Sequence, residues 1–406
     1  MHTETVQLDG HIIDSLVLSK VLDIILLNGG LYEISRFDVG STRTDMTHAE
    51  IVIKANSREL LENIVHQVGQ HGAARDVEEA HSAPAPSDGV FPDGFYSTTN
   101  LDTHVMVGGK WHLVGKTEMD CAIVLTGDGA STVAACKPLH KIAKGDQVVL
   151  GDRGVRVTPA ARREPGSIFS FMGSEVSSER PKELIIAGLA DTMRRAKSEG
   201  KKTLFVGGPA IIHTGASDAL EGLIRQGWIQ VLFAGNALAT HDIEKALYGT
   251  SLGVEIATGA PTSHGHEHHL RAINVIRSAG SIKDAVDSGI LKTGVMKACI
   301  DEGVDFLLAG SIRDDGPLPD VVTDAVKAQD RMRELIEGVG IAIMVATTLH
   351  SVATGNLLPA SVQTICVDSD ADTVIKLMDR GTHQAFGLVT DCEFFLKELA
   401  RQLKAL

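Results

Sequence analysis

The chain has 406 residues, a formal net charge of −14 and 41 glycines, but only three Tyr and two Trp. This length is enough for two or three domains, each with its own core. The acidic balance and the scarcity of aromatic rings argue against nucleic-acid binding, because phosphate backbones attract basic surfaces and bases stack on aromatic side chains. We expect a soluble cytoplasmic protein that binds no nucleic acid.

The cysteines are odd in number and never form a CxxC pair. A disulfide framework or a structural zinc site is therefore not expected, and a reducing compartment is favoured. Glu4 stands where a signal segment would be basic, and no apolar run is long enough to span a bilayer. We expect no membrane association. The five cysteines are Cys121, Cys136, Cys299, Cys366 and Cys392.

Residues 1–80 carry the pattern of a small α+β domain. Asp14 to Leu27 and Ser57 to Gln70 have apolar residues at helical spacing. Leu31 to Phe37 and Ala49 to Ile53 alternate like strands. The order helix–strand–strand–helix predicts a ferredoxin-like fold.

Charged residues lie near the expected strand ends of this domain, at Arg36, Arg43 and Asp45. Arginine side chains bind carboxylates through paired hydrogen bonds. These residues either bind a substrate carboxylate or amine, or form an exposed charged loop.

Residues 81–94 are rich in Pro, Gly, Ser and Asp and predict a linker. The following region, 96–180, alternates short apolar runs with turns and predicts a β subdomain, with a hairpin turn at Gly108-Gly109. The expected strands are Thr103–Val107, Lys110–Val114, Ala122–Leu125, Thr132–Ala135, Gln147–Leu150 and Gly154–Val157.

Residues 181–406 repeat the order strand, small-residue loop, helix. Such βα repeats predict an α/β domain with a doubly wound, Rossmann-like parallel sheet. Ligands of these sheets bind at the carboxyl ends of the strands, so the loops there are the candidate site. The expected strands are Thr203–Val206, Gln230–Phe233, Phe306–Leu308, Ile341–Val345, Thr364–Val367 and Ala385–Val389. The expected helices include Ser217–Gln226, His241–Leu247 and Val321–Ile336.

The stretch Gly340–Asp368 is the strongest indication of a dinucleotide site. A small, hydroxyl-rich loop with Thr347 and Thr348 follows a strand, and Asp368 ends the next strand about twenty residues later. Asp368 would accept hydrogen bonds from a ribose diol and repel a 2′-phosphate, which favours NAD over NADP. The alternative is that Asp368 starts the capping of the next helix.

The usual GxGxxG fingerprint is absent from this half of the sequence. The nearest glycine pair, Gly207-Gly208, precedes Pro209, which has no backbone N–H to donate. Other loops add candidate contacts. Asn236 is placed to bind a phosphate or the nicotinamide amide, while Thr240 or Asp242 would cap the following helix.

Adjacent carboxylates at Asp314 and Asp315 form the best acid/base candidate, because crowding and burial would raise one pKa. An ordinary turn would have the same sequence. His213 is expected either to contact substrate or to cap a helix. Cys392 has no neighbouring His and is expected to make a backbone contact rather than act as a nucleophile.

The segment His264–His269 contains four histidines and one Glu but lacks the HExxH spacing of helical zinc sites. A structural or substrate-contacting histidine is favoured there over a bound metal, and we expect no metal ion.

Several long stretches carry a family likeness: SRFDVGSTRTDMTHAEI, VGGPAIIHTGA, LFAGNALATHDIE, GHEHHLRAIN, LAGSIRDDGPLPD and ATTLHSVATGN with CVDSD. With these, the chain resembles, nearly end to end, the archaeal-type ornithine cyclodeaminases. That family combines an N-terminal lysine-oxoglutarate reductase/saccharopine dehydrogenase-type domain with a deoxyhypusine-synthase-like NAD-binding domain. The same module occurs at the C-terminus of cyanobacterial arginine dihydrolases. This sequence lacks their guanidine-hydrolysing domain, so we expect no arginine breakdown.

The resemblance implies a redox-neutral cycle. Hydride leaves the ornithine α-carbon for NAD, the δ-amine attacks the resulting imine, ammonia departs, and the cyclic imine takes the hydride back to form proline. By this resemblance NAD would contact Asn236, Ala237, Asp315, Thr347, Thr348, Leu349, His350, Asp368, Asp391 and Cys392. We assign acid/base catalysis to Asp315, with His213 second, and carboxylate binding to Arg43 or Arg313, from residue type and loop position.

Other functions fit the same pattern. The chain would otherwise be an amino-acid dehydrogenase, a transferase of the deoxyhypusine-synthase kind, or a non-catalytic NAD-binding regulatory module. Open sheet edges and glycine-rich interfaces favour a homo-oligomer, a dimer or tetramer.

Overall fold

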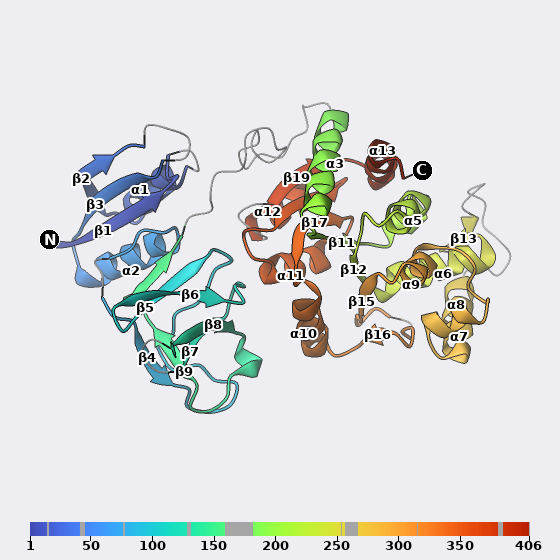
Figure 1. Cartoon of the computed structure of the whole chain (residues 1–406), viewed down its shortest axis with the longest axis horizontal. Helices are drawn as coiled ribbons and strands as arrows, with labels where there is room; N and C mark the ends of the chain where they lie inside the picture. Colours follow the sequence, from blue (N-terminus) through green and yellow to red (C-terminus); the bar gives the residue numbers. More distant parts are fainter. Residues whose placement is uncertain are drawn as a thin grey trace. The chain divides into compact units, whose positions relative to one another are not determined.

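The computed structural model describes residues 1–13, 16–40, 45–75, 78–127, 131–158, 182–252, 254–255, 267–314, 316–380 and 385–405. The chain divides into two compact units (Figure 1). One consists of Met1–Arg163 and Asn356–Ser361, and the other of Glu164–Gly355 and Val362–Leu406.

The N-terminal part of the first unit is a three-stranded antiparallel sheet of order β1-β3-β2. Ala74 forms an isolated antiparallel bridge with Gln7 on the free edge of β1, where the fourth strand of a ferredoxin-like fold would lie. The prediction missed β1, because its many polar residues hide the alternation of Val6 and Leu8. The elements are β1 (His2–Gly10), α1 (Val17–Leu27), β2 (Leu31–Asp38), β3 (Thr47–Ala55) and α2 (Arg58–Gly69).

Local sequence explains where α2 begins and which side it buries. The hydroxyl of Ser57 accepts a hydrogen bond from the N–H of Leu60 at 3.1 Å, which satisfies one of the free donors of the first turn. The buried residues Leu61, Ile64 and Val68 recur every three or four positions, so one face of the helix packs on the sheet.

The region expected to be a linker is partly a strand. His81–Pro84 form β4, which pairs antiparallel with β9 and makes an edge of the second sheet. Pro84 is tolerated because edge strands need fewer backbone donors. The sheet has the order β10-β5-β6-β8-β7-β9-β4. Its other strands are β5 (Thr103–Val107), β6 (Lys110–Gly115), β7 (Ala122–Thr126), β8 (Val133–Lys137), β9 (Gln147–Leu150) and β10 (Val155–Val157).

The β5–β6 hairpin turns at Gly108 and Gly109, as expected. Both have positive φ, 61° and 72°, a conformation that glycine adopts without strain. The carboxylate of Glu79 accepts their two N–H groups at 2.9 and 2.6 Å. The turn residues and this anchor together fix the register of the hairpin.

A short segment of the C-terminal half, Asn356–Ser361, belongs to the first unit. The buried side chain of Asn100 donates a hydrogen bond to the carbonyl of Leu358 at 2.8 Å, and its backbone carbonyl accepts the N–H of Ala360 at 2.8 Å. The N–H of Met119 donates to the carbonyl of Asn356 at 3.0 Å. The chain therefore leaves the second unit in the last turn of helix α11 (Thr348–Leu357) and re-enters it just before strand β18 (Gln363–Asp368).

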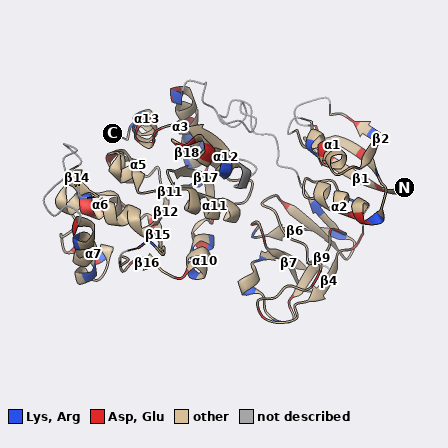
Figure 2. Cartoon of the chain, turned by 180° about the vertical axis from the view of Figure 1, so that it is seen from behind, with Lys and Arg blue, Asp and Glu red and all other residues tan. Residues whose placement is uncertain are grey.

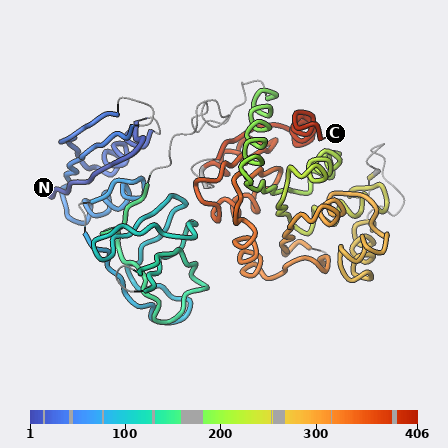
Figure 3. Tube along the Cα trace, in the orientation of Figure 1, coloured from blue at the N-terminus to red at the C-terminus, as the bar shows by residue number. Residues whose placement is uncertain are grey.

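The second unit is built on a seven-stranded parallel sheet of order β16-β15-β12-β11-β17-β18-β19. Apart from the added edge strand β16, this is the 3-2-1-4-5-6 order of a Rossmann fold, with its switch point between β11 and β17. Figure 3 traces the course of the chain, coloured by residue number. The predicted doubly wound sheet is confirmed. The strands are β11 (Lys202–Gly207), β12 (Val231–Gly235), β15 (Asp305–Ala309), β16 (Val321–Val322), β17 (Val339–Val345), β18 and β19 (Ala385–Val389).

Helices surround this sheet, and a two-stranded ribbon joins two of them. The ribbon is formed by β13 (Thr250–Ser251) and β14 (Val254–Glu255). The helices before β15 are α3 (Lys182–Ser198), α4 (Ala210–His213), α5 (Ser217–Arg225), α6 (Asn236–Tyr248), α7 (His268–Ala279), α8 (Ile282–Asp287) and α9 (Val295–Asp301). The later ones are α10 (Ala325–Leu335), α11, α12 (Ala371–Arg380) and α13 (Cys392–Leu403).

The central strands are apolar on both faces because helices cover both. Figure 2 shows them almost free of charge, with Lys, Arg, Asp and Glu on the surrounding helices and loops. Ile341, Ile343 and Val345 on one face of β17 are at most 1% exposed, and Met344 on the other face is 2% exposed. Burying each such side chain contributes about 1.5–3 kcal/mol, which makes this sheet the core of the unit.

Two expected helix boundaries were wrong. Helix α6 begins at Asn236, five residues before the expected start, because it follows Gly235 at the tip of β12 directly. Val321 and Val322 form strand β16 rather than the start of a helix. Helix α10 begins only after Asp324, whose carboxylate accepts the N–H groups of two first-turn residues at 2.9 and 3.1 Å.

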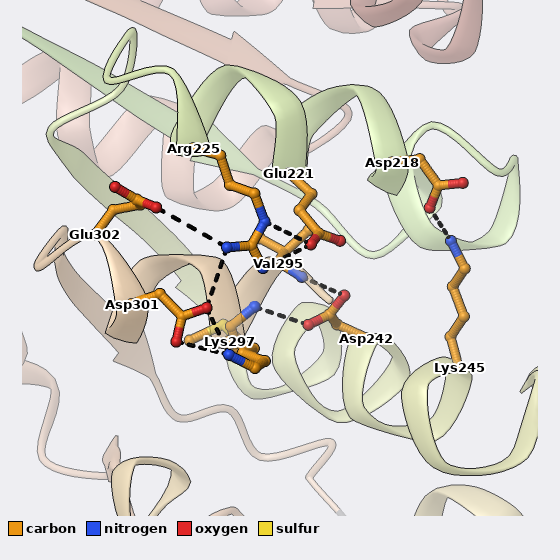
Figure 4. Close-up of polar contacts among 10 residues, drawn as sticks. Asp218, Glu221, Arg225, Asp242, Lys245, Val295, Lys297, Asp301 and Glu302 are labelled. Carbon is orange, nitrogen blue, oxygen red and sulfur yellow. Dashed lines mark hydrogen bonds and ion pairs between the residues drawn. The ribbon is translucent and has the colours of Figure 1, made fainter. Parts of the chain in front are cut away.

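Asp242 does not cap α6 but lies inside it and is fully buried. Its carboxylate accepts the N–H groups of Val295 at 2.9 Å and Met296 at 2.8 Å, at the start of α9 (Figure 4). Gly294 precedes them with a φ of 109°, and a Cβ there would lie 2.8 Å from Oδ2 of Asp242. The carboxylate therefore caps a helix 53 residues further along the chain.

Ion pairs on the outside of this junction join the same helices. In Figure 4, Arg225 of α5 points to Asp301 of α9, with a nitrogen–oxygen distance of 3.1 Å, and Lys245 of α6 reaches Asp218 of α5. These pairs are solvent-accessible and each contributes at most about 1 kcal/mol. The buried Asp242 is the contact that specifies how α9 packs.

Replacing Asp242 with Ala is expected to lower the free energy of unfolding by about 2 kcal/mol or more, because two buried N–H groups lose their acceptor. Urea unfolding at pH 7.5 measures this difference. Asp218→Asn is the matched control, because Asp218 is 80% exposed and its ion pair is weak. Equal unfolding midpoints for Asp242→Ala and wild type would contradict the assignment.

The contribution of Asp242 to the free energy of unfolding changes with pH in a definite direction. Burial raises the pKa of Asp242 to about 6, although its two backbone N–H donors oppose this shift. The folded protein thus binds this proton more tightly than the unfolded chain does. The resulting stabilisation is complete below about pH 4 and is lost as the pH rises through about 6. The wild type should show this loss, amounting to about 3 kcal/mol at most, and Asp242→Ala should not.

Candidate functional site

The carboxyl ends of β11 and β17 meet at the switch point of the sheet. Gly207 pairs with Val345, and the N–H of Gly208 donates to the carbonyl of Val345 at 3.0 Å. A Cβ on Gly208 would lie 1.8 Å from the carbonyl oxygen of Ala346, so only glycine allows this approach. Ala346 itself adopts a φ of 53°, a conformation that alanine rarely adopts. Such strain is characteristic of functional sites.

The expected loop after β17 is shorter than predicted, because helix α11 begins at Thr348. Thr348 and Leu349 are exposed in its first turn. The hydroxyl of Ser351 donates to the carbonyl of Thr347. First-turn N–H groups of a helix at a strand tip can bind a phosphate. The sequence predicted that these residues follow the carboxyl end of β17, as they do, but it predicted a loop where helix α11 begins.

His350 lies near residues at the ends of several strands of the sheet. Its Nδ1 lies 3.5 Å from the hydroxyl of Thr347, and a Cβ on Gly235 would lie 2.8 Å from its Cε1. Burial lowers the pKa of His350, and the carboxylate of Asp314 opposes that shift. Contacts from the ends of β12, β15 and β17 therefore converge on one imidazole.

Asn236 is buried at the start of α6 and holds the loop that follows β15. Its Oδ1 accepts the N–H of Leu318 at 3.0 Å and the hydroxyl of Thr240 at 3.3 Å. Thr240 thus bonds to Asn236 rather than capping the helix. Ala237 lies beside Asn236 and is half-buried. The N-cap residue is Gly235, and no side chain caps this end of α6.

Asp368 ends β18 and is half-buried. Its Oδ1 accepts the N–H of Asp370 at 3.0 Å. Asp370, in turn, accepts the N–H of Asp372 at 3.2 Å and the hydroxyl of Thr373 at 2.7 Å. The direct contacts with the first turn of α12 come from Asp370, so the Asp368 carboxylate stands at the strand tip.

The last strand brings Asp391 and Cys392 to the same edge of the sheet. Asp391 is the N-cap of α13 and accepts the N–H of Phe394 at 2.9 Å. The Sγ of Cys392 lies 3.4 Å from the hydroxyl of Thr214, and burial raises the pKa of this thiol. A thiol that stays protonated is a poor nucleophile.

Two predicted residues, Asp315 and Arg43, lie outside the described residues. Arg313 is exposed, and its N–H donates to the hydroxyl of Ser311 at 3.2 Å. Asp314 accepts the N–H of Ser311 at 2.8 Å, which gives this carboxylate a role in the turn. Arg36 pairs with Asp38 at 2.7 Å on the exposed strand β2.

His213 lies at the end of α4, just beyond the tip of β11. Its Nδ1 is 2.6 Å from the hydroxyl of Ser251, and burial lowers its pKa to about 4. The sequence did not single out its neighbours His241 and Glu244, which are buried in α6. Their spacing of three residues on one helix face was the available signal.

Within the expected histidine segment, His264 and His266 lie outside the described residues. His268 begins α7, stacks on Tyr248 with ring centroids 5.0 Å apart, and has its Nδ1 2.8 Å from the hydroxyl of Thr250. Over the described part of the chain, no three His, Cys, Asp or Glu side chains are grouped so as to hold a metal ion. In that same part, none of the helices has the length and apolar character needed to cross a membrane.

Three family models match the chain in succession. Residues 3–101 match the conserved region of the LOR/SDH bifunctional enzyme. Residues 102–186 match the first region of the C-terminal part of arginine dihydrolase ArgZ-like proteins, and residues 187–399 match the Rossmann fold of that part.

Individual relatives extend over the whole chain. The ornithine cyclodeaminase of Methanothermobacter thermautotrophicus is 50% identical over 100% of this chain and 98% of its own length. The apo structure of ArgZ, an arginine dihydrolase from the ornithine-ammonia cycle in cyanobacteria, superposes with a TM-score of 0.86 at 35% identity. That match covers 99% of this chain but 58% of ArgZ.

A third relative, AgrE, was solved in a ternary complex with ornithine and NAD+. It is 39% identical to this chain, with a TM-score of 0.54, over 99% of this chain and 57% of AgrE. This chain belongs to the archaeal ornithine cyclodeaminase family, with a LOR/SDH-type N-terminal region and an ArgZ-like Rossmann domain.

Proposed function

We propose that this chain is an NAD-dependent ornithine cyclodeaminase, which converts L-ornithine to L-proline and ammonia without net redox change. The main support is the strand edge at the β11–β17 switch point, together with the AgrE relative whose complex holds ornithine and NAD+. The ornithine cyclodeaminases at about 50% identity over the full chain support the same reaction.

The residues at this edge fit NAD. The close approach of Gly208 to Ala346 leaves no side chain between the two backbones, and the first turn of α11 presents N–H groups next to them. Asp368 ends β18, which is two strands away from β11 and Gly208 in the sheet. Its carboxylate lies at the carboxyl end of that strand, where a ribose diol would bind. The proposed contacts are Asn236, Ala237, Asp315, Thr347, Thr348, Leu349, His350, Asp368, Asp391 and Cys392.

Bound NAD would take a hydride from the ornithine α-carbon and return it to the cyclic imine. The protein must then remove protons from the substrate amines and supply one to the departing ammonia. We assign this work to Asp315 and His213. Arg43 and Arg313 are the proposed partners of the substrate carboxylate, since guanidinium groups bind carboxylates in a bidentate manner.

We further propose three domains, over residues 1–80, 96–180 and 181–406, and a homo-oligomer, a dimer or tetramer, in the cytoplasm. The three successive family matches support a division into three regions. Chromatography with light scattering measures the oligomer mass directly.

Purified protein with L-ornithine and a catalytic amount of NAD should produce proline and ammonia in equal amounts with no accumulation of NADH. Proline and ammonia are measured by amino-acid analysis and an ammonia assay, and NADH by absorbance. Stoichiometric NADH would instead identify an amino-acid dehydrogenase. No turnover despite NAD binding would favour a regulatory module.

Replacing Asp368 with Ala is expected to weaken NAD binding about 10- to 100-fold, the effect of losing a hydrogen bond to a charged group. Calorimetric titration measures the dissociation constant. Asp372→Ala removes an exposed carboxylate four residues later and should bind NAD like the wild type. Unchanged affinity in Asp368→Ala would overturn the ribose assignment.

Replacing Gly208 with Ala is expected to abolish measurable NAD binding, because its Cβ would force the β11 tip away from Ala346. The thermal unfolding temperature should also fall, by several degrees. Gly69→Ala is the control, since a Cβ there meets nothing within 4 Å. A Gly208→Ala protein that unfolds and binds NAD like the wild type would show that the close approach is unimportant.

A further inference from the structure

A buried group of polar side chains lies behind the strand edge, and the proposed function uses only one of its members. The group consists of His213 of α4, His241 and Glu244 of α6, and Thr250 and Ser251 of β13, and is called the histidine cluster below. All but His213, which is half-buried, are buried. Burying this many polar groups is unfavourable unless they are hydrogen-bonded to one another.

Glu244 organises one half of the cluster. Its side chain is fully buried, and Oε2 lies 2.8 Å from Nδ1 of His241. Oε1 accepts the hydroxyl of Thr250 at 2.9 Å, and Oε2 also accepts the N–H of Leu252 at 3.3 Å. A carboxylate next to Nδ1 selects the His241 tautomer with hydrogen on that nitrogen, which leaves Nε2 as a proton acceptor.

The other half consists of His213 and Ser251, with Nδ1 of His213 2.6 Å from Oγ of Ser251. The rings of His213 and His241 meet edge to face, with centroids 4.7 Å apart. The next histidine, His269, has its ring centroid 6.4 Å from that of His241. Two imidazoles so close will not both hold a positive charge readily, and the charge of His241 contributes to the lowered pKa of His213.

The helices that carry the cluster start at the strand edge. Helix α4 follows the β11 tip after Gly208 and Pro209, and α6 starts at Asn236 on the β12 tip. His241 is five residues into α6, about 7.5 Å along its axis. A Cβ on Gly207 would lie 2.9 Å from Leu238 and 3.1 Å from Ile211, so strand tip and both helices are packed together.

We propose that His241, positioned by Glu244, and His213, positioned by Ser251, form the acid/base pair that moves protons between the two nitrogens of ornithine during cyclisation. This inference rests on the proposed ornithine reaction and adds His241 as a second catalytic residue. Glu244 and Ser251 are positioning residues, which act through the imidazoles they hold.

The proton balance requires such a pair. One imidazole takes a proton from the δ-ammonium group, whose free amine then attacks the α-imine carbon and forms the ring C–N bond. The ring nitrogen now carries an extra proton, and the α-amino nitrogen needs one to leave. The protonated imidazole gives its proton to the α-amino nitrogen, and the other imidazole takes the extra proton of the ring nitrogen. The α C–N bond breaks, ammonia departs with the bonding electrons, and it takes up the remaining proton as ammonium, which leaves both imidazoles neutral.

The test is Glu244→Gln, which keeps the side-chain size but removes the charge that orients His241. With wild-type protein active on ornithine, kcat should fall about 10- to 100-fold, while KM for ornithine and the dissociation constant of NAD change less than threefold. The acid limb of the pH–kcat profile should also move. Glu334→Gln, on the exposed surface of α10, is the matched control and should keep the wild-type profile.

A second measurement is independent of turnover. Nitrogen NMR of the histidine rings in the wild type should show His241 protonated at Nδ1 and His213 neutral at pH 6, and Glu244→Gln should change the tautomer of His241. If wild-type protein makes no proline, the proposed function fails, while the NMR result still tests the Glu244–His241 contact. If the wild type is active and Glu244→Gln retains its kcat, pH profile and His241 tautomer, the inference is overturned.

Discussion

The close contact of two backbones at the switch point of the Rossmann sheet is the constraint on which the rest of the site depends. Gly208 at the end of β11 donates to the carbonyl of Val345, and there is no room between it and Ala346 for even one methyl group. The strained φ of Ala346 is part of the same contact. These neighbouring strands are parallel, and the strand order reverses between them, which is the point where sheets of this type bind their ligands.

Helix α6 connects this edge with the layer behind it. Its first residue, Asn236, holds the loop after β15; Asp242 caps α9; and Glu244 holds His241 and β13. Two of these three are buried carboxylates, which are costly to place in an apolar interior unless several donors satisfy them. Each has such donors. Because α6 starts at the end of β12 and these polar contacts hold it in place, the position of the strand end also determines the position of the histidine cluster.

The chain passes between the N-terminal unit and the Rossmann domain more than once. The segment Asn356–Ser361 begins in the last turn of α11, which starts just after the carboxyl end of β17, and it precedes the strand that ends at Asp368. It is held in the first unit by the buried side chain of Asn100. Ala360 is part of the hydrophobic core of the β subdomain. The two regions expected to bind NAD are therefore separated in sequence by residues of the other unit.

The sequence by itself determined the elements whose residue types form a clear local pattern. Apolar runs such as Ile341–Val345 predicted buried parallel strands, and the Gly108-Gly109 turn predicted a hairpin, because burial on both faces and positive φ each leave a mark on residue type. The polar strand β1 and the short strand β4 were missed, since they lack a clear apolar pattern and pairing with distant strands stabilises them. Only the tertiary structure decided what Asp242, His241 and Glu244 do. The spacing of His241 and Glu244 within α6 was a signal for their contact, but folding alone brings Asp242 to α9 and Glu244 to β13, which a pattern within one helix could not reveal.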